Sequence, residues 1–193
     1  MLERCQAHLI AGDERQTRLL QKVARAAGFG SCDPLHPLEP ASKISYFLVH
    51  FETSLLVKTS VLKIVRRSDD EAVCFSPIIV IANDCPFDMV LDYIKLGFDD
   101  VVSLPDKRPS LTQRFESQVN SSHIYFQTTN YLGPDRRRME AVDNPHENRG
   151  TGDAGFVRIL LRRDVHAGVH IQRTIVGTQD NREAIAGGLR ELM

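Results

Sequence analysis

The sequence predicts an α/β protein with a doubly wound, five-stranded parallel sheet, followed by a C-terminal extension that contains a β-hairpin. Two observations predict the sheet. Short apolar runs alternate with segments of helical periodicity, and several of these runs are apolar throughout, as in strands that helices cover on both faces. The expected strand order is 2-1-3-4-5, with right-handed crossovers and a binding crevice at the carboxyl ends of strands one and three.

The first half of the sheet follows from the N-terminal segment. His8–Ala11 is a short apolar run, and Asp13 is placed to cap a helix that ends near Gly28. Ser31–Lys43 contains three prolines and is at most a short edge strand. Ile44–Phe51 is almost continuously apolar, which predicts a strand buried on both faces.

The second half alternates helices with strands. Each predicted helix has apolar residues at helical spacing, and each predicted strand is a short apolar run. The helices are expected at Leu55–Arg67, Pro86–Leu96 and Ser110–Val119, and the strands at Ile78–Ile81 and Val101–Leu104.

The character of the chain changes after residue 120. We divide it into a sheet domain (1–120), a polar tail and linker (121–155) and an extension (156–193). Phe156–Val176 alternates apolar and polar residues around a turn near Gly168, which predicts a hairpin, and Asp180 is placed to cap a closing helix. An isolated hairpin is marginal in water, so its apolar face needs a cover. Self-association is favoured over packing on the sheet domain. The apolar face consists of Val157, Ile159, Leu161, Val169 and Ile171.

Composition bounds the function. The net charge of −1 and the pI near 6.7 provide no overall basic field, so we expect no generic nucleic-acid binding. No apolar run approaches the roughly 20 residues of a membrane span, and the N-terminus lacks the apolar core of a signal peptide. We therefore expect a cytoplasmic protein. The four cysteines show no C-x-x-C spacing, which favours reduced structural thiols over a metal site.

One stretch carries a resemblance to a known family. Ser76–Pro105 reads SPIIVIANDCPFDMVLDYIKLGFDDVVSLP: a buried strand, a loop, a helix, a Gly-Phe-Asp-Asp corner, a second strand and a proline. It resembles the back half of a receiver domain from the response regulators of two-component systems. Tyr125–Arg138, YFQTTNYLGPDRRR, is similar to the FVRTxTYFGPDRRR segment of a group of stand-alone receiver proteins from alphaproteobacteria. The resemblance covers roughly residues 5–139.

The resemblance also shows what is missing. A phosphorylatable receiver needs an acidic pair for Mg²⁺, a phospho-acceptor Asp, a Thr or Ser, and a Lys, all at the carboxyl ends of the strands. In this sequence those positions fall on Gly12 and Asp13, His50, Ala82 and Leu104, so four of the five chemical positions are lost. The resemblance therefore implies a pseudo-receiver with a degenerate phospho-acceptor site, no catalytic residue, no metal and no cofactor.

Each remaining polar residue near this site has two interpretations. His50 is a replacement phospho-acceptor or metal ligand, or a neutral histidine that fills the vacated pocket; the second is favoured. Glu52 mimics a phosphoryl charge or is a solvated loop carboxylate, again with the second favoured. Either Asp13 and Glu14 hold a cation weakly, or Asp13 caps its helix. Capping is favoured, because a site for a cation that prefers oxygen ligands would have too few of them here.

The tail is expected to dock on its own domain or on a partner. Its arginines suit phosphate groups, but between residues 131 and 150 four arginines face four acids, so a nucleic-acid role is not favoured. A cyclic-dinucleotide site would need a D-x-S-x-x-G segment, which does not follow. The tail residues expected to make contacts are Tyr131, Gly133, Pro134, Asp135, Arg136, Arg137 and Arg138.

The sequence thus favours a non-enzymatic, receiver-like signalling or adaptor protein that acts by protein–protein contact. The expected surface is Pro86–Val119, the partner a histidine kinase or another regulator, and the protein a homo-oligomer. Two alternatives stay open. One is a small-ligand sensor that uses the crevice near Asp13, His50 and Ala82. The other is a nucleic-acid-associated regulator whose contact face is basic, with Arg158, Arg162, Arg163, Arg173, His166 and His170.

Overall fold

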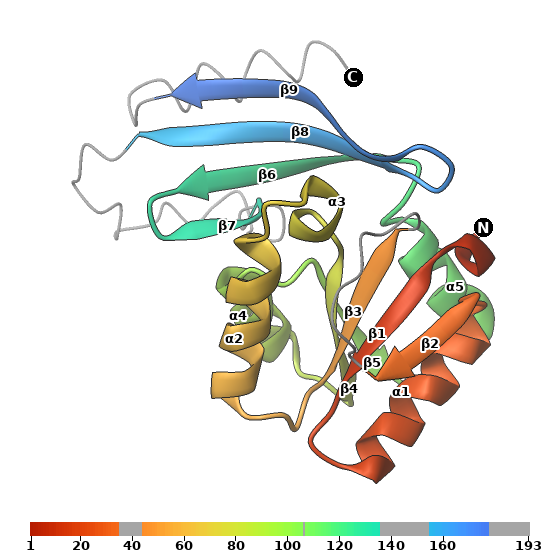
Figure 1. The fold of residues 1–193 in the computed structure, drawn as a ribbon. Coiled ribbons are helices and arrows are strands. Elements are labelled where there is room, and N and C mark those ends of the chain that lie inside the picture. Colours follow the sequence, from red (N-terminus) through yellow and green to blue (C-terminus); the bar gives the residue numbers. More distant parts are fainter. Residues whose placement is uncertain (35–43, 106, 136–154, 178–193) are drawn as a thin grey trace.

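The computed structural model describes residues 1–34, 44–105, 107–135 and 155–177, and in this part of the chain two sheets lie one above the other (Figure 1). The first is a five-stranded parallel sheet with the order β2-β1-β3-β4-β5, as the sequence predicts. Its strands are β1 (Gln6–Ile10), β2 (Ser31–Pro34), β3 (Ser45–His50), β4 (Ile78–Asn83) and β5 (Asp100–Leu104).

Helices cover both faces of this sheet. On one face the buried side chains of the sheet pack with those of α1 (Glu14–Ala27) and α5 (Arg108–Glu116). On the other they pack with α2 (Leu55–Arg66) and α4 (Phe87–Leu96). Two short helices, η1 (Leu2–Arg4) and α3 (Glu71–Cys74), lie at the amino ends of the strands. The doubly wound fold class is therefore confirmed.

The helix boundaries have local causes. The Asp13 Oδ1 atom accepts a hydrogen bond from the Gln16 amide at 2.8 Å, which caps α1 as the sequence predicts. Gly28 ends the helix in the left-handed conformation with φ +94°. The α5 helix begins two residues earlier than predicted, at Arg108, with a proline in its first turn, and ends at Glu116. No helix among the described residues is long and apolar enough to span a membrane.

The second sheet is antiparallel, with the order β7-β6-β8-β9. The predicted hairpin is present as β8 (Phe156–Asp164) and β9 (Gly168–Gly177), with a bulge at Leu160/Leu161. Two further strands, β6 (Ser122–Thr128) and β7 (Tyr131–Pro134), come from the segment to which the sequence analysis assigned no strand. The proposed cap at Asp180 and most of the linker lie outside the described residues.

Most of the apolar face of the hairpin is covered within the chain, whereas Ile171 is 38% exposed. Ile159 and Leu161 are buried against Tyr125 of β6 and against Cys74 and Phe75 at the end of α3. Packing on the sheet domain, which the sequence analysis ranked second, is therefore what the structure shows. Pairing with a second chain, which the sequence favours, is therefore not needed to cover Ile159 and Leu161.

Candidate functional site

The five receiver-site positions lie at one end of the parallel sheet. Gly12 and Asp13 follow β1, and His50 ends β3, where it pairs in register with Ile81. Ala82 lies next to Ser103 in the register of β4 and β5, and the final pair of that ladder includes Leu104. The fold thus places all five at the carboxyl ends of the strands, where a doubly wound sheet has its crevice.

The polar groups at the start of α1 are used by the helix itself. The Asp13 carboxylate caps α1, and the Gly12 amide donates to Gln16 Oε1 at 2.7 Å. The Gln16 amide nitrogen Nε2 in turn donates to Glu52 Oε2 at 3.2 Å. No group of three His, Cys, Asp or Glu side chains that could hold a metal ion occurs among the residues described. This geometry agrees with the capping interpretation of Asp13.

His50 is a buried, uncharged side chain. Only 3% of its surface is exposed, and its Nδ1 atom accepts a hydrogen bond from the Glu52 amide at 3.2 Å. Burial lowers the pKa of His50 below its ordinary value, although the neighbouring Glu52 carboxylate, 3.9 Å from Nδ1, acts in the opposite direction. The ring is therefore neutral near pH 7, and since Nδ1 is an acceptor, the proton is on Nε2.

The positions that would carry the hydroxyl and the lysine are apolar. Ala82 is 2% exposed, and the adjacent Ser103 hydroxyl accepts from the Cys85 amide at 2.9 Å. A lysine does approach this end of the sheet, but from α2. Lys58 is 5% exposed, and its Nζ atom donates to the Phe51 carbonyl and, at 3.1 Å, to the Tyr93 hydroxyl.

Lys58 is a residue of this site that was not predicted, although the sequence contains a signal for it. It lies three and seven residues before Val61 and Val65, on the apolar stripe of α2. A lysine on such a stripe is buried or reaches a polar group beyond it. In the structure it holds the loop after β3 to α2, so it is a structural cation near the crevice rather than a replacement for the missing lysine after β5.

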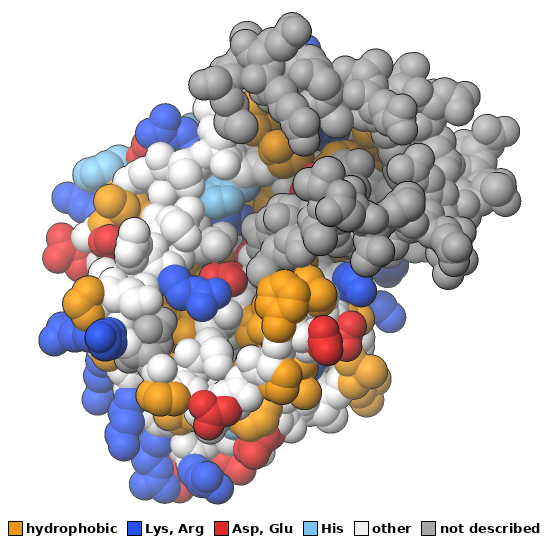
Figure 2. All heavy atoms as spheres, turned by 180° about the vertical axis from the view of Figure 1, so that it is seen from behind, with side chains coloured by type: hydrophobic (Ala, Val, Ile, Leu, Met, Phe, Trp, Pro, Cys, Tyr) orange, Lys and Arg blue, Asp and Glu red, His pale blue; other side chains and the backbone are white. Residues whose placement is uncertain are grey.

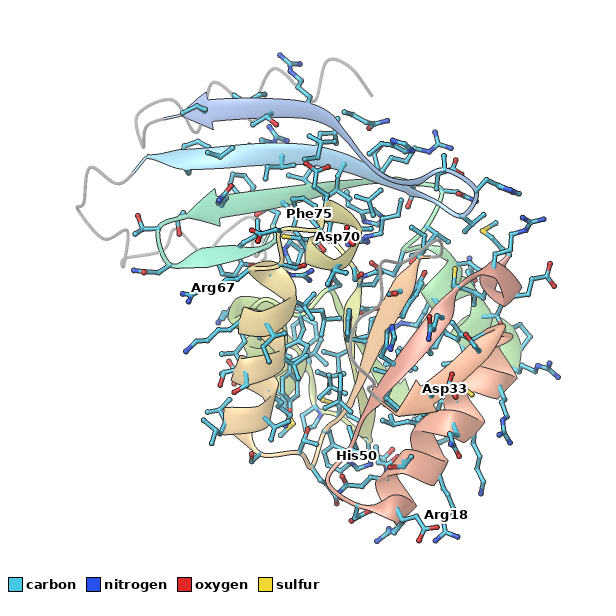
Figure 3. All side chains as sticks on the ribbon, viewed as in Figure 1. Arg18, Asp33, His50, Arg67, Asp70 and Phe75 are labelled. Atoms are coloured by element: carbon cyan, nitrogen blue, oxygen red, sulfur yellow. The ribbon has the colours of Figure 1, made fainter. Side chains whose placement is uncertain are left out.

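A cavity of about 580 Å³ opens beside the crevice, between α1 and the ends of β3 and β4. Figure 3 shows His50 and Arg18 at this same end of the molecule. The cavity is lined by Arg15, Gln16, Arg18, Leu19, Lys22, His50, Glu52 and Asn83.

A second polar cluster lies at the opposite end of the sheet and joins the two sheets. We call it the Asp99 cluster: Asp99, Arg66, Arg163 and Tyr125. The Asp99 carboxylate accepts from Arg66 Nη2 at 2.6 Å, from Arg163 Nη2 at 3.1 Å, from the Ile78 amide at 2.8 Å and from the Tyr125 hydroxyl. Asp99 is 2% exposed and Arg163 is completely buried.

The arginines of the Asp99 cluster also bind backbone. Arg66 Nη1 donates to the carbonyls of Cys74 and Ser76 at 2.7 and 2.8 Å. Arg163 Nε donates to the Phe75 carbonyl at 2.7 Å. Burial by itself raises the pKa of Asp99, but the two guanidinium groups and the hydrogen bonds outweigh it and hold that pKa below its ordinary value. The carboxylate is therefore ionised at neutral pH.

The beginning of the GPDRRR tail docks on the same corner. A Cβ atom on Gly133 would lie 2.7 Å from the Tyr131 hydroxyl oxygen and 3.3 Å from the Cα atom of Gly97. A larger residue at this position would have to displace the Tyr131 ring and the backbone at Gly97. The Tyr131 hydroxyl donates to the Pro134 carbonyl at 2.8 Å. Four of the expected tail residues thus lie in or next to β7: Tyr131, Gly133, Pro134 and Asp135. The other three, Arg136, Arg137 and Arg138, lie outside the described residues.

Comparison with solved structures finds two that show a weak similarity to this chain. One is a protein from Chloroflexus aurantiacus J-10-fl that is described as a response regulator. It is 14% identical to this chain, and the alignment covers 58% of this chain and 95% of that chain with a TM-score of 0.45. Another is the beryllofluoride-activated NtrC4 receiver domain dimer, with 12% identity, 60% and 95% coverage and a TM-score of 0.42. No protein-family model and no curated protein matches the chain. The fold assignment rests on the strand order, which receiver and flavodoxin-like proteins share.

Proposed function

We propose that this chain is a non-phosphorylatable, receiver-like signalling protein that acts by contact with a protein partner. The observation that carries the proposal is the chemistry of the crevice. The positions that hold metal, accept phosphate and read the product in a working receiver are here a glycine, a buried neutral histidine, an alanine and a leucine. The remaining carboxylate, Asp13, caps α1. Similarity of the tail to stand-alone alphaproteobacterial receivers supports a role in bacterial signalling.

The first test is chemical. With Mg²⁺ and acetyl phosphate, the protein is expected to form no phosphoryl adduct, because the residue that ends β3, where a receiver has its phospho-acceptor, is His50 and not a carboxylate. Intact-mass and peptide-mapping mass spectrometry check this. A phosphoryl group on Asp13, His50 or Glu52 contradicts the proposal.

Restoring the phospho-acceptor alone is expected to leave the protein unphosphorylated. In His50→Asp the new carboxylate still lacks a second metal ligand at Gly12 and a hydroxyl at Ala82. The substitution places a charge at a site that is 3% exposed, so it is expected to lower the free energy of unfolding by about 1–3 kcal/mol. Mass spectrometry after acetyl phosphate and urea denaturation measure the two effects. Stoichiometric phosphorylation of this variant shows that the crevice is functional after all.

The exposed side of α4 is the best candidate for the partner surface. Phe87 and Met89 are 61% and 43% exposed, and the neighbouring Asp88 and Asp92 are exposed acids. Figure 2 shows hydrophobic side chains with acidic ones among them on the rear face of the molecule. Aromatic residues and methionine are enriched where proteins meet. The charge pattern fits a partner that presents an apolar cluster rimmed by lysine or arginine.

This surface is tested by matched variants. Phe87→Ser/Met89→Ser is expected to abolish capture of a specific protein that the wild type retains from the native organism. Leu56→Ser, at a 76% exposed position on α2, is the control and is expected to retain it. Binding of the purified partner should weaken at least about tenfold in the double variant only. Equal retention by the wild type and the double variant removes α4 from the proposal.

The nucleic-acid alternative is weakened by burial. Of the basic residues that the sequence analysis placed on one face of the hairpin, Arg163 is fully buried and Arg158 is 9% exposed. Arg163 is committed to the Asp99 cluster. The exposed members are Arg162, His166, His170 and Arg173. Phosphate contacts need exposed cations, so burial removes two of the four arginines from a nucleic-acid contact face.

A further inference from the structure

Among the described residues, α5 contacts α1 near the C-terminal end of α1. Arg108, the first residue of α5, donates from Nε to the Ala26 carbonyl at 3.0 Å, next to the last residue of α1. The α5 helix therefore meets α1 at the end of α1 that is remote from the crevice. Beside the first two turns of α1, the space holds the cavity of about 580 Å³ described above. That volume is in the range of small-molecule sites, about 300–1,000 Å³.

The α1 wall of the cavity is cationic. Arg15, Arg18 and Lys22 follow one another at helical spacing and all line it. Figure 2 shows lysine and arginine side chains gathered along the α1 edge of the molecule, at the lower left of that view. The one acid among the described lining residues is Glu52, and it accepts a hydrogen bond from Gln16. Arg18 also has an exposed partner, Glu14 at 3.3 Å.

The opposite wall presents a buried hydrogen-bond donor. His50 is among the lining residues although only 3% of its surface is exposed, so what it exposes faces the cavity. Its Nδ1 atom accepts a hydrogen bond from the Glu52 amide, so the proton of the neutral ring is on Nε2, and Nε2–H is a donor. Within the described part of the chain Nε2 has no acceptor. The side-chain amide of Asn83, at the end of β4, lies on the same wall.

We infer that this cavity binds a small phosphorylated ligand. A phosphate offers oxygen acceptors in several directions. One wall of the cavity supplies two guanidinium groups and an ammonium group, and the other wall supplies a neutral N–H donor and an amide, so both walls can donate to it. A metal ion is disfavoured, because a single exposed carboxylate faces three cations. The inference goes beyond the proposed function, since it does not depend on the α4 surface and gives the protein an input that needs no phospho-acceptor.

Binding is tested by calorimetry with inorganic pyrophosphate and ADP as phosphate probes and citrate as a carboxylate probe. The wild type is expected to bind at least one phosphate probe with a dissociation constant below about 1 mM. Arg15→Gln and Lys22→Gln are each expected to weaken binding about tenfold, as loss of a charged hydrogen bond does. The control is Arg25→Gln, an exposed arginine of the same helix that does not line the cavity.

A second readout locates the ligand. In nitrogen-15 spectra of the histidine rings, the His50 Nε2 signal is expected to shift on addition of the phosphate probe, and His50→Phe to bind about tenfold more weakly. The thermal unfolding of each variant verifies that it is folded. The inference is overturned if neither phosphate probe binds at millimolar concentration, if citrate binds as tightly, or if Arg25→Gln loses as much affinity as Arg15→Gln.

Discussion

Replacing Asp99 by asparagine is expected to lower the free energy of unfolding by about 3–5 kcal/mol, the range for removing one partner from a buried ion pair. The change leaves the buried guanidinium groups of Arg66 and Arg163 without the carboxylate that both contact. It also replaces an acceptor of the Tyr125 hydroxyl and the Ile78 amide by a side chain with fewer acceptor sites. Urea denaturation, followed by circular dichroism, measures the loss.

The adjacent acid provides a matched control. Asp100 pairs with Arg114 at 2.8 Å, but 38% of the arginine side chain is exposed. Asp100→Asn is therefore expected to cost no more than about 1 kcal/mol, the usual value for a solvated pair. Equal losses in the two variants show that the Asp99 cluster stabilises the fold no more than a surface pair.

The pH dependence of stability provides an independent check on Asp99. Its pKa is lowered in the folded protein, because the arginines and hydrogen bonds outweigh burial. A carboxylate whose pKa is lower in the folded than in the unfolded protein stabilises the fold. This stabilisation is complete above the pKa of the unfolded state, near 3.9, and is lost as the pH falls through the pKa of the folded state. The difference in stability between the wild type and Asp99→Asn is thus expected to be constant from pH 7 to about 5 and to shrink below about pH 4. A constant difference down to pH 2 contradicts an ionised Asp99.

Ending the chain at residue 155 is expected to abolish cooperative unfolding of the remainder. The truncation removes β8 and β9, exposes Tyr125 and Phe75, and deletes Arg163 from the Asp99 cluster. Burial of each large apolar side chain contributes about 1.5–3 kcal/mol, and the broken buried pair adds a cost of about 3–5 kcal/mol. Together these losses are comparable with the whole stability of a domain, about 5–15 kcal/mol.

The truncated protein is compared with the full chain by near-ultraviolet circular dichroism and urea titration. Val176→Ser, at a position of β9 that is 76% exposed, serves as the control and is expected to change stability by less than about 0.5 kcal/mol. A truncated protein with a sharp unfolding transition and native near-ultraviolet signal shows that residues 1–155 fold independently. The division of the chain at residue 120 then gains support.

The parallel sheet was predictable because its signals are local. Continuous apolar runs such as that of β3, the Asp13 cap and the glycine after α1 each specify one element, and the alternation of strands with helices predicts that the sheet is parallel. The strands β6 and β7 have no such signal. Ile124, Tyr125 and Phe126 are consecutive, so no period of two appears, and β7 has four residues that include glycine and proline.

The Asp99 cluster was missed for a different reason. Arg163 follows Val157, Ile159 and Leu161 at the period of two, so the alternation already placed it on the inward face. Arg163 was nevertheless expected on a solvated basic face, because its acidic partner is distant in the chain. Asp99 lies in the Gly-Phe-Asp-Asp corner, 64 residues earlier, and no local pattern joins the two. The five positions that the resemblance assigns to a phospho-acceptor site, in contrast, do lie at the carboxyl ends of the strands, because the ends of apolar runs define them.

Helix α2 touches both ends of the parallel sheet. Its first turns carry Lys58, which holds the loop after β3 near the crevice, and its last residue is Arg66 of the Asp99 cluster. With 12 residues it is a rod about 18 Å long. A tilt of this rod that loosened Lys58 would also strain the buried bonds of Arg66, so the crevice and the second sheet are linked mechanically. The contacts of Lys58 with Phe51 and Tyr93 both lie within the parallel-sheet half, so hinge motion between the two sheets is opposed at the other end of α2, where Arg66 shares the Asp99 carboxylate with Arg163 of the second sheet.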